Sequence, residues 1–323
     1  MKEILNEGHL TEYSMKVLKK WFQFFRLGNV IIMLLTFYLI RYCVSKPYAN
    51  QYNINLIFNE FNFILLVCVT ALTAMAGYVV NNIYDAELDK INKPTQSFIE
   101  SLITRSNAWK LFFGLNLAAT FLIFRVYFSI DWFLIWMYPF GFFLTWGMLW
   151  LYSFRYKKSV LKGNLIVGLF VSFVPWSVCY PELVDMALGK IPWDGMFFYA
   201  GILYIVFAFV STILREIIKD CEDIEGDAQF GCRTLPVVYG IAYTNRFAQV
   251  VSTVLLLLLI FASVLLFKLK LIWSLAYSMV FIVLPLLIIF SKLKGSTTKK
   301  DFHNLSQICK VLMLTGLLFL LVV

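Results

Sequence analysis

The chain has 323 residues, of which 61% are hydrophobic and 15% are charged, and its formal net charge is +9. Soluble domains are usually about 45–50% apolar and about 25% charged, so this composition indicates an integral membrane protein. The six cysteines show no CxxC spacing and only two histidines are present, so we expect no zinc or haem site. The basic residues form no separate domain, so we expect no nucleic-acid partner.

Nine apolar segments are long enough to cross a bilayer as helices, because about 20 residues span a hydrocarbon core of about 30 Å. They are 22–43, 61–83, 106–128, 131–152, 163–181, 195–218, 242–267, 271–292 and 303–323. No alternating barrel pattern appears, and backbone groups facing lipid must be satisfied internally, so we predict an all-α protein. A single transmembrane domain is expected over 22–323, after an N-terminal segment 1–21.

Lysine and arginine are concentrated on one side of the predicted spans. This bias places the N-terminus and the two long polar segments, 84–105 and 219–241, in the cytoplasm. In a prokaryote the membrane would be the plasma membrane. The two polar segments follow the second and sixth spans, which indicates two four-helix halves plus a ninth helix around a central cavity.

The end of the second span carries the first group of chemically informative residues. Asn81, Asp85 and Asp89 are spaced i, i+4, i+8, so a helix presents them along one face. Carboxylates at such spacing repel each other by a few tenths of a kcal/mol per pair. Mg²⁺ would offset this repulsion, because it takes oxygen ligands and is commonly shared between one or two carboxylates and substrate phosphates.

The sixth span ends in a second acidic group with the same property. Asp220, Asp223 and Asp227, at i, i+3 and i+7, share one helical face. A solvated surface loop would also be acidic, but the recurrence of this spacing beside two spans favours a metal site. The predicted metal ligands are therefore Asn81, Asp85, Asp89, Asp220, Asp223 and Asp227.

Basic residues near the acidic groups indicate a phosphate ligand. Lysine and arginine neutralise a diphosphate, and arginine often does so through two hydrogen bonds. For the lysines after the fourth span, anchoring at the membrane surface is the alternative. The nearby cations are Lys93, Arg155, Lys157, Arg215, Lys219 and Arg233.

At these residues the chain resembles the UbiA superfamily of intramembrane prenyltransferases. Asn81–Asp89 resembles the NDxxDxxxD motif, Tyr152–Lys157 the tyrosine-to-lysine motif, and Asp220–Asp227 the DxxDxxxD motif. Phe25–Asn29 is similar to the Arg-Pro-x-Asn entry of the first span. One departure is Asn82, which stands where the family commonly has an aspartate.

The resemblance implies that Mg²⁺ ions bridge both acidic segments and the diphosphate of a prenyl diphosphate. Asp85, Asp89, Asp223 and Asp227 would then be the catalytic residues. A dry pocket would protect the allylic carbocation, whose formation metal ions and basic side chains assist. The implied substrate-binding residues are Arg26, Asn29, Lys93, Tyr152, Arg155, Lys157, Asn164, Arg215, Lys219 and Arg233.

The segment Arg215–Asp227 is most similar to the branch that makes digeranylgeranylglyceryl phosphate, which implies a lipophilic acceptor bearing a glycerol phosphate. Prenylation of an aromatic quinone precursor is the alternative within the family. A transporter or cation channel is the alternative of another class, but its acidic residues should lie deeper in the spans. No obligate protein partner is evident.

Overall fold

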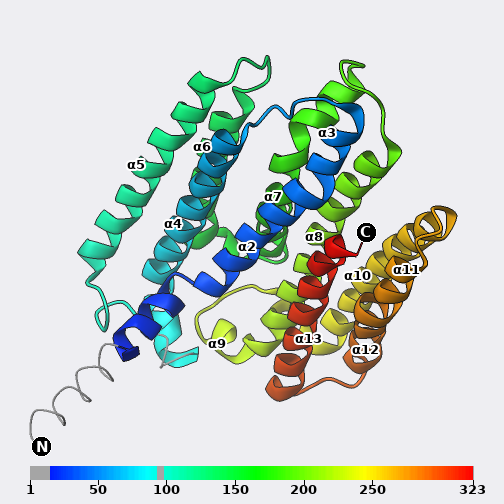
Figure 1. Cartoon of the computed structure of the whole chain (residues 1–323). Coiled ribbons are helices and arrows are strands. Elements are labelled where there is room, and N and C mark those ends of the chain that lie inside the picture. The colour runs from blue at the N-terminus through cyan, green and yellow to red at the C-terminus, as the bar shows by residue number, and fades with distance from the viewer. Residues whose placement is uncertain (1–14, 93–97, 323) are drawn as a thin grey trace, which may run out of the picture. The chain divides into compact units, whose positions relative to one another are not determined.

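The computed structural model describes residues 15–92 and 98–322, and the side chains of 88–92 lie outside the described part. The described residues are mostly helical and contain no strand, which confirms the predicted all-α class. They divide into two compact units, each made of two stretches of chain (Figure 1). The first unit contains the residues up to Leu34 together with Glu60–Phe154, and the second contains Leu35–Asn59 and the residues from Arg155 onward.

The first unit is built around α4 (Glu60–Asn92), the longest helix in it. This helix packs against α5 (Arg105–Ser129) and α6 (Met137–Phe154), as Figure 1 shows. Residues 15–24 are also helical, and the chain then turns into α2 (Leu27–Ile40), whose first half belongs to this unit.

The core of the first unit forms where one face of α4 meets its neighbours. Phe24, Val79, Ile83 and Phe112 are at most 2% exposed there. Gly77 permits a close approach to α6, because a Cβ at this position would lie 3.0 Å from a methyl carbon of Leu149. The helix that carries the first acidic group is therefore held on two sides.

The second unit is organised around α8, which packs against α7, α10 and α13. Its core contains Leu214, Ile217 and Ile218 of α8 together with Leu255 of α10 and Leu305 of α13, all at most 1% exposed. Its elements are η1 (Arg41–Ser45), α3 (Lys46–Tyr52), η3 (Tyr156–Lys158), α7 (Lys162–Ala187), α8 (Gly195–Glu222), α9 (Ile224–Gln229), α10 (Leu235–Lys268), α11 (Ile272–Ser278), η4 (Met279–Val283), α12 (Leu284–Leu293), α13 (Lys299–Leu318) and η5 (Phe319–Leu321).

Helix α13 is defined by contacts at both of its ends. Thr298 and Asp301 form a capping box, in which the Thr298 hydroxyl accepts from the Asp301 N–H and the Asp301 carboxylate accepts from the Thr298 N–H. Near the other end, a Cβ at Gly316 would lie 2.5 Å from Phe207 of α8. Glycine is thus what lets α13 lie close against α8.

Within the described residues, eight helices are long and apolar enough to cross a membrane. The predicted number of nine spans is not confirmed: the fourth predicted span, 131–152, corresponds to α6, which is not among the eight. Helix α6 is rich in tryptophan, tyrosine and glycine, and these residues lower its mean hydropathy. Leu117, Phe121 and Phe128 of α5 are 72–77% exposed, as expected of side chains that face lipid. The protein is therefore a multi-pass integral membrane protein.

Candidate active site

In the first unit, α4 brings Asn81 and Asp85 together. They lie one turn apart, each is 6% exposed, and the Asn81 side-chain amide donates to Asp85 Oδ2 at 2.7 Å. The helix is regular here, so the i, i+4 spacing alone sets this contact. The hydrogen bond fixes the orientation of the Asp85 carboxylate.

The structure describes the side chain of Asn82 beside the first acidic group, but not those of Asp89 and Lys93. Asp89 lies further along α4, but its side chain is outside the described residues, and so is Lys93. Asn82 is 5% exposed and donates its side-chain amide to the carbonyl oxygen of Phe24 at 2.9 Å. An ionised aspartate could not donate this bond, so Asn82 joins α4 to the helix at 15–24.

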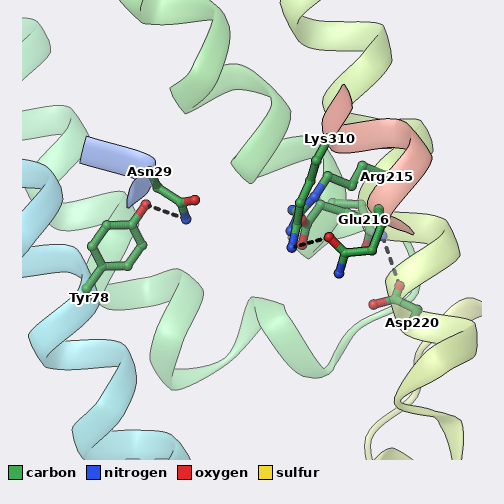
Figure 2. Close-up of polar contacts among 8 residues, drawn as sticks. Asn29, Tyr78, Arg215, Glu216, Asp220 and Lys310 are labelled. Carbon is green, nitrogen blue, oxygen red and sulfur yellow. Dashed lines mark hydrogen bonds and ion pairs between the residues drawn. The ribbon is translucent and has the colours of Figure 1, made fainter. Parts of the chain in front are cut away.

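The entry to α2 is attached to the same helix. Asn29 donates its side-chain amide to the Tyr78 hydroxyl at 3.3 Å, as Figure 2 shows, and the Arg26 guanidinium lies 5.2 Å from the centre of the Tyr78 ring. Arg26 has a φ of 47°, the left-handed conformation that turns the chain from the preceding helix into α2. Tyr78 precedes Asn81 and Asp85 by three and seven residues, so all three share one face of α4.

In the second unit, α7 and α8 meet at an Asn–Asp contact. Asn164 lies in the first turn of α7 and is 7% exposed. Its side-chain amide donates to Asp220 Oδ2 at 2.9 Å. The bond joins residues 56 positions apart, and it resembles the Asn81–Asp85 contact because each amide orients a carboxylate of an acidic group.

The second acidic group does not lie on one continuous helix, in contrast to the expectation from its spacing. Helix α8 ends at Glu222, and Asp223, with φ −96° and ψ 6°, links it to the short helix α9. The Asp227 N–H still donates to the Asp223 carbonyl oxygen at 3.1 Å, so the chain bends without losing this contact. Asp220 therefore lies on α8, Asp223 at the junction and Asp227 on α9.

Among the carboxylates that the structure describes outside the spans, Asp227 is the most buried, at 8% exposed. Its burial and the neighbouring Asp223 raise its pKa above the ordinary value of an aspartate, and Lys157 and Lys219 act in the opposite direction. A buried carboxylate beside a second one favours binding of a cation or a proton. The two lysines bring positive charge to the same place.

A backbone contact holds the basic segment near this group. The Arg233 N–H donates to the Lys158 carbonyl oxygen at 2.8 Å, which joins η3 to the loop before α10. Lys157, beside this contact, is within electrostatic range of Asp227. Within the second unit, the segment after Arg155 therefore contacts the residues that follow the second acidic group.

The model of the UbiA prenyltransferase family matches residues 48–314. The chain belongs to this family. The match includes both acidic groups and the tyrosine-to-lysine stretch, so it covers most of the residues on which the resemblance was based.

Curated relatives of this prenyltransferase include two archaeal proteins named digeranylgeranylglyceryl phosphate synthase. The one from Korarchaeum cryptofilum is 30% identical over 265 residues, which cover 80% of this chain and 84% of the relative. The one from Sulfolobus acidocaldarius is 33% identical over 202 residues, which cover 62% of this chain and 64% of the relative. The second alignment thus spans slightly less than two thirds of that relative.

Two solved structures share the fold of this prenyltransferase. A structure of digeranylgeranylglyceryl phosphate synthase matches with a TM-score of 0.61 and 22% identity over 95% of this chain and 98% of that one. A UbiA homologue from Archaeoglobus fulgidus, bound to DMAPP and Mg²⁺, matches with a TM-score of 0.58 and 14% identity over 94% of this chain and all of that one. At such identities the likeness concerns the fold.

The structure distributes the predicted site residues of the prenyltransferase between its two units. The first unit contains Arg26, Asn29, Asn81, Asp85 and Tyr152, and the second contains Arg155, Lys157, Asn164, Arg215, Lys219, Asp220, Asp223, Asp227 and Arg233. That the two acidic groups face each other across a cavity stays a prediction.

The oxygen donors of both groups suit Mg²⁺, which prefers carboxylate and carbonyl oxygens. Among the described residues, no three histidine, cysteine or acidic side chains lie close enough together to hold a metal ion by themselves. Mg²⁺ commonly takes only one or two carboxylates, with phosphate oxygens and water as its other ligands. The Asn81–Asp85 pair and the Asp223–Asp227 pair each suit a Mg²⁺ ion that takes its remaining ligands from phosphate and water.

Sequence reasoning missed two features near the site. Tyr78 was overlooked, although its spacing of seven residues before Asp85 places it on the acidic face of α4. The polar residues of α13 were also overlooked, among them Gln307 and Lys310, because they belong to no motif. Their position inside an apolar span was the signal that could have found them.

Proposed function

We propose that this UbiA family member transfers a prenyl group from a prenyl diphosphate to the hydroxyl group of a glycerol phosphate lipid, with Mg²⁺ as cofactor. The bond between the prenyl C1 and the diphosphate breaks, a bond from the acceptor oxygen to C1 forms, and pyrophosphate and the hydroxyl proton are released. The names of the curated relatives support this choice of acceptor.

The observation that carries the proposal is the environment of Asp227. This buried carboxylate lies beside Asp223 and within electrostatic range of Lys157 and Lys219. Carboxylates alone would bind a cation, and lysines alone would bind an anion. Both together suit a magnesium diphosphate, whose metal takes the carboxylates and whose phosphate oxygens take the lysines.

The side chains divide the work in this proposal. Asp85 in the first unit, and Asp223 and Asp227 in the second, would hold Mg²⁺. Asn81 and Asn164 keep the carboxylates of Asp85 and Asp220 oriented through their hydrogen bonds. When bound, Mg²⁺ stabilises the negative charge that grows on the departing pyrophosphate.

The basic side chains would add to the stabilisation of the leaving group. Lys157 and Lys219 place positive charge beside Asp227, where the phosphate oxygens would lie. Helix spans rich in apolar side chains would keep water from the allylic carbocation. We further place the acidic groups on the cytoplasmic side, in a plasma membrane if the source is prokaryotic, because of the lysine and arginine bias.

The test is a transfer assay on the purified full-length protein. It would contain prenyl diphosphates of several chain lengths and, in separate reactions, geranylgeranylglyceryl phosphate or a hydroxylated aromatic acid, with products identified by mass spectrometry. We expect prenylation of the glycerol phosphate and loss of turnover with EDTA. Turnover of the aromatic acid alone would contradict the proposed acceptor. The absence of pyrophosphate release with both acceptors would contradict the proposed prenyl transfer.

A further inference from the structure

Helix α13 carries a line of exposed polar side chains, of which His303 contacts Glu222 of α8. His303, Gln307 and Lys310 are spaced i, i+4, i+7 and therefore share one face. The neighbouring helix α8 packs directly on α13 and carries polar residues at the same spacing. We call this set the α8–α13 polar stripe: Arg215, Lys219, Glu222, His303, Gln307 and Lys310.

The stripe is connected by hydrogen bonds along α13. Lys310 Nζ donates to Gln307 Oε1 at 3.3 Å, Gln307 Nε2 lies 3.4 Å from His303 Nε2, and His303 Nδ1 lies 2.9 Å from Glu222 Oε1. A neutral imidazole protonated on Nδ1 satisfies both of its contacts, because it donates to Glu222 and accepts from Gln307. With this tautomer every donor in the line points toward Glu222, and the line begins at Lys310.

Lys310 lies inside a membrane-spanning segment. It is 11 residues beyond Lys299, the start of α13, which places it about 16 Å along the helix at about 1.5 Å per residue. In the described part of the chain, no carboxylate lies within ion-pair distance of its ammonium group, whose hydrogen bond goes to the neutral amide of Gln307, although Glu222 lies within electrostatic range. An ionised side chain at such a depth is costly without an anionic partner and usually marks a functional site.

A second cationic side chain, that of Arg215, lies near Lys310. Arg215 is within electrostatic range of Lys310, and Figure 2 shows both side chains reaching toward the region beside Glu216. Glu216 Oε1 accepts from Arg215 Nη1 at 2.6 Å, which engages one of the five N–H groups of the guanidinium. The remaining N–H groups of Arg215 and the ammonium of Lys310 form a donor set suited to a phosphate.

We propose that Arg215 and Lys310 bind the phosphate group of the acceptor lipid. The proposal rests on the proposed function and adds α13 to the substrate site. Asp223 lies eight residues beyond Arg215, about 12 Å along the chain of α8 at 1.5 Å per residue. A phosphate at Arg215 and Lys310 is thus separated from the diphosphate near Asp223 and Asp227, and the glycerol carbons and the reacting hydroxyl occupy the interval.

The experiment compares Lys310→Met with the matched control Lys299→Met, which removes an exposed lysine at the start of the same helix. Steady-state kinetics are measured with each substrate varied in turn. We expect Lys310→Met to raise the KM for the glycerol phosphate acceptor about tenfold, since it removes a charge-assisted hydrogen bond, with the KM for the prenyl diphosphate changed less than about twofold. Lys310→Arg should restore most of the acceptor affinity.

A second readout needs no turnover. Binding of labelled geranylgeranylglyceryl phosphate to the detergent-solubilised protein, without Mg²⁺ or prenyl diphosphate, should be lost in Lys310→Met and kept in Lys299→Met. If the wild type transfers nothing to this acceptor, the proposed function fails, and the binding assay still decides whether Lys310 holds a lipid phosphate. Unchanged acceptor binding in Lys310→Met, or a rise in the KM for the prenyl diphosphate alone, would overturn the inference.

Discussion

Two groups of polar and charged residues within the second unit differ in what they contact. One is the α8–α13 polar stripe, and the other is a buried set that we call the Arg41–Glu182 cluster: Arg41, Ser45, Glu182 and Asp185. All four members of this cluster are 1–7% exposed. Glu182 Oε1 accepts from the Ile57 N–H at 3.0 Å, and Arg41 donates to the Phe58 carbonyl oxygen.

The difference lies in what the charges contact. In the Arg41–Glu182 cluster they bind the main chain of the segment before α4, so they hold a loop in place. In the stripe, the line of hydrogen bonds begins at Lys310, whose hydrogen bond is to a side-chain amide. A charge in a membrane span must be satisfied, either by the chain itself or by a ligand. We therefore expect changes in the cluster to reduce stability, and changes around the stripe to affect catalysis and binding.

The largest expected effect concerns the acidic group that adjoins the stripe. Asp223→Asn and Asp227→Asn should each lower kcat by a factor of about 10²–10³, because each removes charge stabilisation realised as pyrophosphate leaves. The melting temperature in detergent should stay close to that of the wild type. Glu225→Gln, an exposed acidic residue on the same short helix α9, is the matched control. Near-wild-type kcat in both aspartate variants at saturating Mg²⁺ would contradict the metal site.

The next effect tests the other side of the comparison. Glu182→Ala should lower the free energy of unfolding by about 1–3 kcal/mol, because it leaves the Ile57 N–H without its acceptor in a buried environment. Glu182→Gln should cost less, since its amide oxygen still accepts from Ile57. Denaturant unfolding in detergent would measure both. A Glu182→Ala protein of normal stability that has lost transfer activity would show that the cluster takes part in function.

A smaller effect is expected where α13 packs on α8. Gly316→Ala places a Cβ 2.5 Å from Phe207, so the phenyl ring or the helix must move, at a cost of about 1–3 kcal/mol. Because α13 carries Lys310, we also expect a rise of a few-fold in the KM for the acceptor. Gly295→Ala, where a Cβ would meet nothing within 4 Å, is the control. Equal kinetics and stability in the two variants would mean that the spacing of α8 and α13 does not matter to the stripe.

The smallest expected effect is on the stability of α13, without an effect on substrate binding at the stripe. Thr298→Ala removes the capping box of α13 and should cost about 1 kcal/mol in unfolding free energy. The stripe begins one turn further along the helix, so both KM values should stay unchanged. Thermal unfolding and the transfer assay would check these two expectations, and a raised acceptor KM would indicate that the capped end itself contacts the acceptor.

Residue spacing within single helices was sufficient to predict much of this protein. Long apolar runs require helices in a membrane, because only an internally hydrogen-bonded backbone is tolerated there. Asn81 and Asp85 are four residues apart, so helix geometry alone predicts the contact that the structure shows. The acidic spacings and their neighbours were also enough to identify the family, which residues 48–314 match.

Tertiary packing decided what spacing could not. The bond from Asn82 to Phe24 joins positions 58 apart, and that from Asn164 to Asp220 joins positions 56 apart. The bend at Asp223 moved Asp227 off α8, although its spacing from Asp220 is that of one helical face. Lys310 became a candidate binding residue because α13 packs on α8 and brings it within electrostatic range of Arg215. Spacing determines which residues share a face of one helix, whereas the helix that covers this face depends on how all the apolar surfaces pack together.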